Sequence, residues 1–173
     1  MAGQIFKSCK FYGYAVIQIL IEPRRFFTEL PDNTKLLNSL GFCVICSLFF
    51  ALAGLLTGSY PHPIKMGMIF FFSSIFMVFI STGLSYMIMV MTIGKQSSFE
   101  QLFNVYAFSS GMVQLVSWMS FFLWFTEPWK WWLVYTGFKN TCQFSWKPAF
   151  LILLVTIVGQ FFLLYSLYLA FLK

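Results

Sequence analysis

Residues 36–57 read LLNSLGFCVICSLFFALAGLLT and carry no charged side chain. A helix needs about 20 mainly apolar residues to cross a hydrocarbon layer roughly 30 Å thick, so this stretch predicts a transmembrane helix. The chain is therefore predicted to be an all-α integral membrane bundle of about five transmembrane helices. Four more apolar stretches follow after short loops, at about residues 64–93, 101–125, 128–140 and 148–171.

The stretch at 128–140 has two interpretations. Its apolar core, Trp129–Phe138, is too short to span a membrane comfortably. It is either a short fourth span merged with the end of the third, or a re-entrant piece. If it crosses, the tryptophans near it predict an aromatic belt at the outer interface. These tryptophans are Trp124, Trp129, Trp131 and Trp132.

A helix-start signal precedes the third span. The sequence Ser97-Ser98-Phe99-Glu100 follows a turn at residues 94–96. It predicts a capping box in which Ser97 is the N-cap and the Glu100 side chain reaches back to its backbone.

Residues 1–33 are predicted to form an amphipathic interfacial region, and residues 34–173 the five-span transmembrane domain. Pro23 suits the first turn of a second short helix over Arg24–Leu30, because its missing N–H is not needed there. Such a helix would lie along the headgroups with Phe26 and Phe27 dipped into the membrane. The apolar side of the region would be Ile5, Phe6, Val16, Ile17, Leu20 and Ile21, and the wet side Lys7, Lys10, Gln18 and Glu22. The residues expected to contact lipid headgroup phosphates are Arg24, Arg25 and Lys35.

Composition excludes a water-soluble fold. The chain is 60% hydrophobic and 22% aromatic, and only 9% of its residues are charged, whereas soluble domains carry about 25%. The net charge of +6 comes from basic residues at the ends of apolar segments. That placement indicates membrane orientation and contact with anionic lipids, so membrane lipids are expected partners and nucleic acid is not.

The lysines and arginines also predict orientation. With a cytoplasmic N-terminus and five crossings, eight of them lie inside and three outside, as the positive-inside rule requires. If 128–140 does not cross, the split becomes seven against four. We prefer five crossings, which place Lys65, Lys130 and Lys173 outside and Lys7, Lys10, Arg24, Arg25, Lys35, Lys95, Lys139 and Lys147 inside.

No catalytic, cofactor-binding or metal-binding set is expected. Cys43-Val44-Ile45-Cys46 is formally a C-x-x-C, but it lies in an apolar helix where a thiolate is costly. The single histidine, His62, stands between two prolines and fits a rigid turn. All five acidic residues lie at segment ends or in loops, whereas ion-coupled transporters keep a carboxylate at membrane depth.

Two sets of residues within the spans are candidates for function or packing. Polar side chains in lipid form hydrogen bonds between helices. They act either as packing contacts or as the lining of a substrate path. We also expect the two glutamines of the set to face each other. These intramembrane polar residues are Ser110, Gln114, Ser117 and Gln160. Small residues let helix backbones approach closely. The predicted helix-packing residues are Gly54, Gly58, Ser81, Gly83, Ser85 and Gly111.

Three motifs together resemble the Yip (Ypt-interacting protein) domain family over about residues 22–170. The first is Glu22-Pro23-Arg24-Arg25-Phe26-Phe27-Thr28-Glu29-Leu30-Pro31 before an apolar span. The second is Gly94-Lys95-Gln96-Ser97-Ser98-Phe99-Glu100-Gln101 followed by Val105-Tyr106-Ala107-Phe108-Ser109. The third is Trp131-Trp132-Leu133-Val134-Tyr135-Thr136-Gly137-Phe138-Lys139 with Ser145-Trp146-Lys147-Pro148-Ala149.

The chain departs from the family in two places. Ser110-Gly111 stand where members often have a proline, and the long soluble N-terminal region of eukaryotic members is missing. We therefore expect a compact prokaryotic-type member of the inner membrane, with a Rab-GTPase partner disfavoured.

We expect a non-enzymatic multi-pass protein that acts as a scaffold or accessory subunit of a membrane complex. Its partners would be other integral membrane proteins or further copies of itself. The alternative is a permease- or channel-forming subunit for a small solute or lipid.

Overall fold

The computed structural model describes residues 2–30, 36–117 and 122–171, with side chains from residue 11 onward apart from a few near the C-terminus and at 123. Every regular element in these ranges is a helix, which confirms the all-α prediction. The helices are α1 (Ala2–Ile21), α2 (Pro23–Glu29), α3 (Leu36–Thr57), α4 (Pro63–Ile93), α5 (Phe99–Gln114), α6 (Leu123–Asn140) and α7 (Trp146–Phe171).

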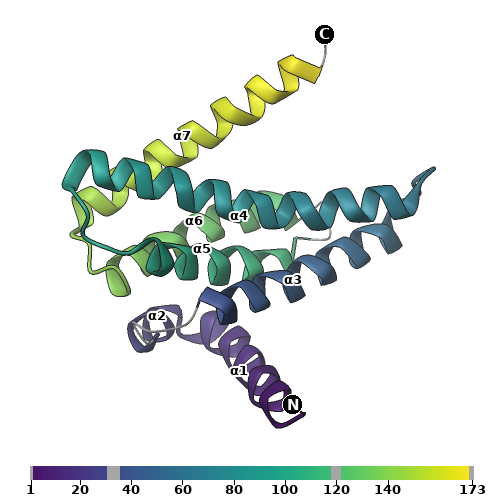
Figure 1. Ribbon diagram of the computed structural model, residues 1–173, viewed down its shortest axis with the longest axis horizontal. Coiled ribbons are helices and arrows are strands. Elements are labelled where there is room, and N and C mark those ends of the chain that lie inside the picture. Colours follow the sequence, from purple (N-terminus) through teal and green to yellow (C-terminus); the bar gives the residue numbers. More distant parts are fainter. Residues whose placement is uncertain (1, 31–35, 118–121, 172–173) are drawn as a thin grey trace.

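Helices α3 to α6 run back and forth roughly along one long axis, and α7 returns obliquely to it (Figure 1). The α3–α4 turn lies at one end of that axis, and the α4–α5 and α6–α7 loops lie at the other. Within the described ranges, three helices are long and apolar enough to cross a membrane: Leu36–Thr57, Pro63–Ile93 and Trp146–Ser166. An integral membrane protein is therefore supported, and the number of crossings depends on α5 and α6.

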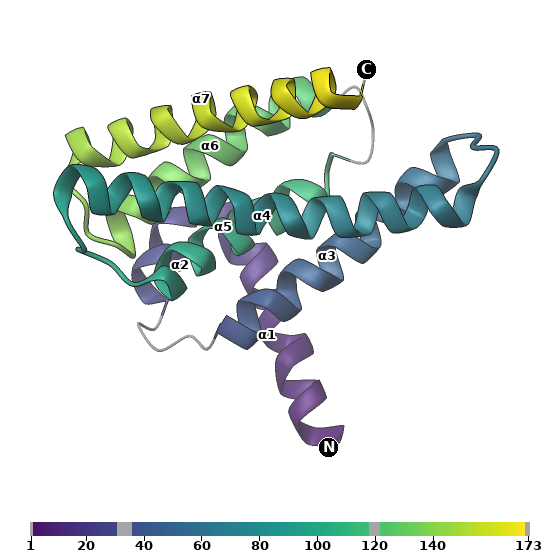
Figure 2. The same cartoon turned by 45° about the horizontal axis from the view of Figure 1, so that its top comes forward.

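Helix α5 forms the centre of the bundle. It packs against α3, α4 and α6, and every residue from 102 to 109 is buried. Helix α7 has a different position: it packs on α4 and α6 from its start to about Gln160 (Figure 2), and its last turns diverge from the bundle (Figure 1). The core is thus built around α5, and α7 forms an edge.

The prediction of one helix over 101–125 is wrong. Helix α5 ends at Gln114, where the chain tightens into a turn: the Val116 and Ser117 N–H groups both bond to the Val113 carbonyl, at 3.0 and 2.9 Å. The next helix begins at Leu123 and runs through Pro128 to Asn140. The segment 128–140 is therefore the larger part of an 18-residue helix.

The capping box is displaced by one residue from its predicted place. Ser98 is the N-cap: its Oγ accepts from the Gln101 N–H at 3.2 Å, and its own N–H donates to Gln101 Oε1 at 3.0 Å. Ser97 is buried instead and donates to the Cys142 carbonyl at 3.4 Å. Both serines precede a residue with a suitable side chain three positions on, so the pattern alone could not choose between them.

The N-terminal helices pack on the bundle more closely than the sequence predicts. Pro23 opens α2 in its first turn, as expected. Phe26 and Phe27, however, are 4% and 0% exposed and belong to the protein core, so their predicted insertion into lipid is wrong. The Phe26 ring lies 5.1 Å from that of Phe108, and Thr141 Oγ1 donates to the Phe27 carbonyl at 2.7 Å.

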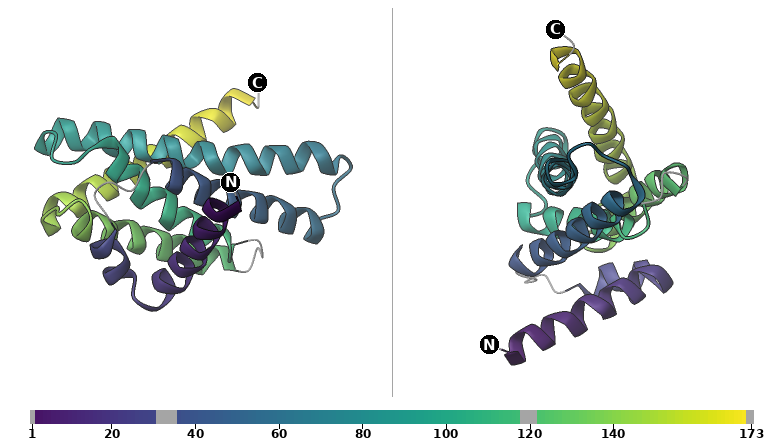
Figure 3. Two further views of the ribbon diagram at one scale, coloured as in Figure 1. Left: turned by 60° about the horizontal axis from the view of Figure 1, so that its bottom comes forward. Right: turned by 90° about the vertical axis from the view of Figure 1, so that its right-hand side faces the viewer.

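Helix α1 has two different faces. Ala15 and Ile19 are buried against the protein. Gln18 was predicted to face water, but it is buried and donates a hydrogen bond to Glu29 of α2. The opposite face is exposed and apolar, including Ile17 and Leu20. Viewed nearly along α4, α1 lies largely across the bundle axis (Figure 3, right). This orientation suits a helix that lies on a membrane surface.

Candidate functional site: a polar cleft between α4, α5, α6 and α7

A cleft of about 210 Å³ opens between the second half of α5 and the neighbouring helices. All four residues predicted as intramembrane polar groups line it, although they come from two helices and a turn. Ser110 and Gln114 lie on α5, Ser117 lies in the turn that follows, and Gln160 comes from α7.

Each glutamine is held by a serine of another helix. Gln114 Oε1 accepts a hydrogen bond from Ser47 Oγ of α3 at 2.9 Å, and Gln160 Nε2 of α7 donates to Ser81 Oγ of α4. The two side chains thus share one cleft, and each is tied to its own serine. These bonds join α3 to α5 and α4 to α7, which is the packing role expected of buried amides in a bilayer.

An ion pair also lines this cleft, and the sequence interpretation missed it. Glu127 and Lys130 of α6 lie one turn apart, with Lys130 Nζ 2.7 Å from Glu127 Oε2. The Lys130 side chain is 20% exposed and lies over the Trp131 ring, with its Nζ 4.6 Å from the ring centroid. The spacing Glu127-x-x-Lys130 was the available signal, because it places both charges on one helix face.

A second polar contact lies deeper, between α4, α5 and α7. Ser85 Oγ lies 2.6 Å from the Tyr106 hydroxyl and 2.8 Å from Thr156 Oγ1. All three side chains are almost fully buried. Ser85 was predicted as a small packing residue, and it is also a hydrogen-bonding one. Nothing in the spacing of Tyr106 and Thr156 along the chain reveals that they meet.

The predicted small residues behave differently from one another. Gly111 does allow a close approach, because a Cβ there would lie 2.7 Å from the Phe42 ring and 3.3 Å from Cys46 Sγ. Gly83 has nothing within 4 Å of a Cβ position, so its predicted packing role is wrong.

The Gly54-x-x-x-Gly58 pattern does not form a helix crossing. A Cβ at Gly54 would make an ordinary contact of 3.5 Å with Phe70, and Gly58 lies beyond the end of α3, against Tyr60. The sequence interpretation missed Gly137, where α6 closes on Val105 of α5.

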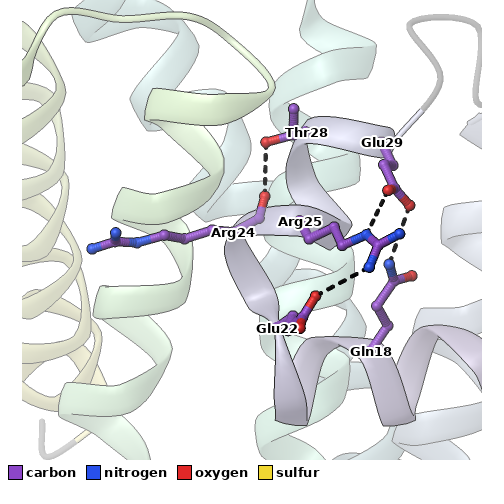
Figure 4. Close-up of polar contacts among 6 residues, drawn as sticks. All are labelled: Gln18, Glu22, Arg24, Arg25, Thr28 and Glu29. Atoms are coloured by element: carbon purple, nitrogen blue, oxygen red, sulfur yellow. Dashed lines mark hydrogen bonds and ion pairs between the residues drawn. The ribbon is translucent and has the colours of Figure 1, made fainter.

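The predicted headgroup residues divide into two kinds. Arg25 pairs with Glu29 at 2.7 Å and with Glu22 at 3.5 Å, and its hydrogen bond lowers the pKa of the Glu29 carboxyl, helped by a bond from Gln18. Arg24 points the other way, away from this cluster (Figure 4). Lys35 lies outside the described residues.

The aromatic belt is not a single band. Trp124 at the start of α6 is 87% exposed, whereas Trp132 lines a recess beside Arg24. Eight residues of helix separate them, or about 12 Å along the axis. Trp132 is therefore farther along α6 than Trp124 and lies toward the end of the bundle where α2 packs.

The described residues offer no group of three or more metal-ligating side chains. Cys43 and Cys46 are free thiols buried in the core, next to the α3–α5 contact. In chemical terms the cleft presents hydroxyls, amides and one ion pair among apolar side chains such as Phe50, Met77 and Val113. These groups can bind a polar solute or water, or fix helices in place.

The family model of the Yip1 domain matches residues 17–170, nearly the whole chain. No curated protein and no solved structure matches. The chain therefore belongs to the Yip1 domain family, which confirms the resemblance found in the three motifs.

Proposed function

We propose that this Yip1-domain chain is a non-enzymatic scaffold or accessory subunit of a membrane complex. The observation that supports this most directly is the last part of α7, beyond Gln160, which diverges from the bundle (Figure 1). Its aromatic side chains are largely exposed, including Phe162 at 74% and Tyr165 at 61%. A membrane helix that its own chain does not cover offers a surface for a partner helix, either of another protein or of a second copy.

Affinity purification of the tagged chain from its native membranes, with quantitative mass spectrometry, tests this proposal. We expect a partner at fixed stoichiometry with the wild-type chain and its loss when Phe162 and Tyr165 are both changed to leucine. Leucine keeps the surface apolar, so insertion should not change. A matched control changes Phe72 and Phe76 on the exposed face of α4, 53% and 62% exposed, and should keep the partner. Recovery of the chain alone would contradict the proposal.

A second candidate function is a permease- or channel-forming subunit for a small solute or lipid. The gathering of Gln114, Gln160 and the Glu127–Lys130 pair around one cleft supports it. Flux into liposomes containing the purified chain distinguishes the two functions. If the cleft is a path, Gln114→Leu should reduce flux. If the chain is a scaffold, the same change should only lower stability, because it removes the bond to Ser47.

We also propose an inner-membrane location in a bacterium, five crossings and a cytoplasmic N-terminus. The alternating directions of α3 to α7 support five crossings, because they place α2 and the α6–α7 loop at the same end (Figure 1). That end carries most of the described basic side chains, as the positive-inside rule requires of the cytoplasmic face. They are Arg24, Arg25, Lys95, Lys139 and Lys147, whereas Lys65 lies in the first turn of α4, at the other end. Lys130, which was predicted to lie outside, is instead within α6, about two turns from its start. Labelling of single cysteines introduced at Lys65 and Lys95 from outside the cell should modify only the first.

A further inference from the structure

The recess between α2 and α6 differs from the polar cleft in its charge. It has a volume of about 170 Å³ and is lined by Arg24, Trp132, Tyr135, Thr136, Lys139 and Asn140. Two of these side chains are cationic, and none is acidic. A small, partly enclosed space with two positive charges suits an anion with several oxygen acceptors.

Neither cation has an ion-pair partner among the residues that the structure describes. Among the described residues, the ion pairs involve Arg25 and Lys130, and none involves Arg24 or Lys139. Figure 4 makes the difference between the two adjacent arginines visible: Arg25 turns to Glu22 and Glu29, and Arg24 extends in the opposite direction. Their different environments follow from their neighbouring positions on α2, which place the side chains on different sides of the helix.

The other lining groups are already positioned. Thr136 Oγ1 donates to the Trp132 carbonyl and Asn140 Nδ2 to the Thr136 carbonyl, both at 2.9 Å, so these side chains are fixed along α6. The Thr141 hydroxyl bond to the Phe27 carbonyl, 2.7 Å long and buried, holds α2 against the end of α6. The distance between the two helices that supply Arg24 and Lys139 is therefore set by the fold.

The location of the recess favours a lipid over a soluble anion. It lies where α2 packs on α6, and Ile21 at the end of α1 is an exposed apolar residue that lines the adjoining hollow. Trp132 is 45% exposed and also lines the adjoining hollow. The other residues of that hollow are Ile21, Glu22, Pro23, Arg24 and Arg25. Tryptophan and tyrosine are enriched at headgroup level, where one side of the ring is apolar and the other wet.

We infer that this recess binds the phosphate of a single anionic phospholipid, with Arg24 and Lys139 as the cationic contacts. Tyr135 supplies a hydroxyl donor, and Trp132 supports the glycerol and upper acyl region. This site does not depend on the scaffold or permease role. It also separates Arg24 from Arg25, which the sequence treats as equivalent.

Native mass spectrometry of the full chain in neutral detergent tests the inference. We would titrate phosphatidylglycerol and, separately, phosphatidylcholine, and count lipids retained per chain. One phosphatidylglycerol should be retained preferentially. Arg24→Gln and Lys139→Gln should each weaken its retention about fivefold, the usual effect of one basic side chain near an anionic lipid.

The matched control is Arg25→Gln, which makes the same charge change one residue away. It should leave retention within about twofold, because Arg25 is already paired. Equal weakening by Arg24→Gln and Arg25→Gln would mean diffuse attraction and would overturn the site. Equal retention of both lipids by the wild-type chain would also overturn it.

A third arm distinguishes the lipid from free phosphate. Inorganic phosphate in millimolar excess should not displace phosphatidylglycerol, because the acyl chains add apolar contacts with the protein and detergent that free phosphate lacks. Displacement would assign the recess to a soluble anion instead. Lys139 is exposed at the last turn of α6, so Lys139→Gln keeps the test valid if the α2 variant fails to fold.

Discussion

Helices α5 and α7 belong to one bundle but have opposite surroundings. Helix α5 is buried along residues 102–109 and carries polar side chains such as Tyr106 and Gln114 in that interior. Helix α7 is apolar enough to span a membrane by itself, yet much of its second half is exposed. In water the more apolar helix would be the inner one. In a bilayer, apolar side chains are needed where the helix meets lipid, and the interior accepts polar groups that find partners.

The largest expected change in stability comes from comparing two phenylalanines, one in α5 and one in α7. Phe108 of α5 is fully buried, with the rings of Phe26 and Phe42 5.1 and 5.0 Å away, whereas Phe162 of α7 is 74% exposed. Phe108→Ala should destabilise the fold by about 3 kcal/mol, because it leaves a cavity among packed rings. Phe162→Ala should change stability little, since lipid replaces the ring. Equilibrium unfolding in mixed micelles measures both, and similar losses would contradict the contrast.

A glycine pair gives the next largest effect. Gly111→Ala in α5 pushes a methyl group against the Phe42 ring and should cost about 1–3 kcal/mol through overpacking. Gly159→Ala in α7 meets only Leu84, at 3.8 Å, so the better helix propensity of alanine should leave stability unchanged or raise it by up to about 1 kcal/mol. Thermal unfolding followed by tryptophan fluorescence should therefore show a lower midpoint for Gly111→Ala and an unchanged or higher midpoint for Gly159→Ala.

A tyrosine pair isolates one hydrogen bond. Tyr106→Phe removes the hydroxyl that lies 2.6 Å from Ser85 Oγ and should cost about 0.6–2 kcal/mol. The loss is moderate because Ser85 keeps its contact with Thr156. Tyr165→Phe in α7, at a side chain that is 61% exposed, should have no effect on the same unfolding midpoint. An equal shift in both would show that the buried hydroxyl contributes nothing specific.

The smallest effect belongs to the surface ion pair at α2. The Arg25 hydrogen bond lowers the pKa of Glu29 below its ordinary value of 4.5, so the folded state favours the carboxylate. The stabilisation is present above that value and is lost as the pH falls through the lowered pKa. We expect a slight fall in the unfolding midpoint below about pH 4. Glu29→Gln should remove this part of the pH dependence, and an unchanged dependence would assign it to another group.

The sequence predicted the elements that depend on lipid contact and missed those that depend on packing. The apolar runs located α3, α4 and α7 well, because exposure to hydrocarbon imposes an unbroken apolar stretch. The break after Gln114 was not visible, because the residues that follow it remain apolar while the helix ends in a turn. Phe26 and Phe27 were predicted to face lipid, because the short sequence of α2 does not reveal that the Phe108 ring of α5 packs against the Phe26 ring.

The candidate site was predicted in the same uneven way. The four intramembrane polar residues share one cleft because polar groups collect where lipid is absent. Their partners were not predictable: Ser47 is 67 residues from Gln114, and Ser81 is 79 from Gln160. The division between Arg24 and Arg25 needed the direction of each side chain, which depends on where α2 packs.

The shortness of α5 has a consequence for biogenesis. Its 16 residues extend about 24 Å, less than the hydrocarbon thickness, and α6 carries Glu127 and Lys130 within its length. Neither helix would partition well into a bilayer as an isolated segment. In the proposed five-crossing topology they must enter together, as a hairpin received by α3 and α4, which are synthesised first. Insertion and folding then become one event for this pair. A substitution that weakens the packing of α5 would therefore first reduce correct membrane insertion, giving chains with an inverted or untranslocated segment. Lower stability of the inserted protein would be a later effect.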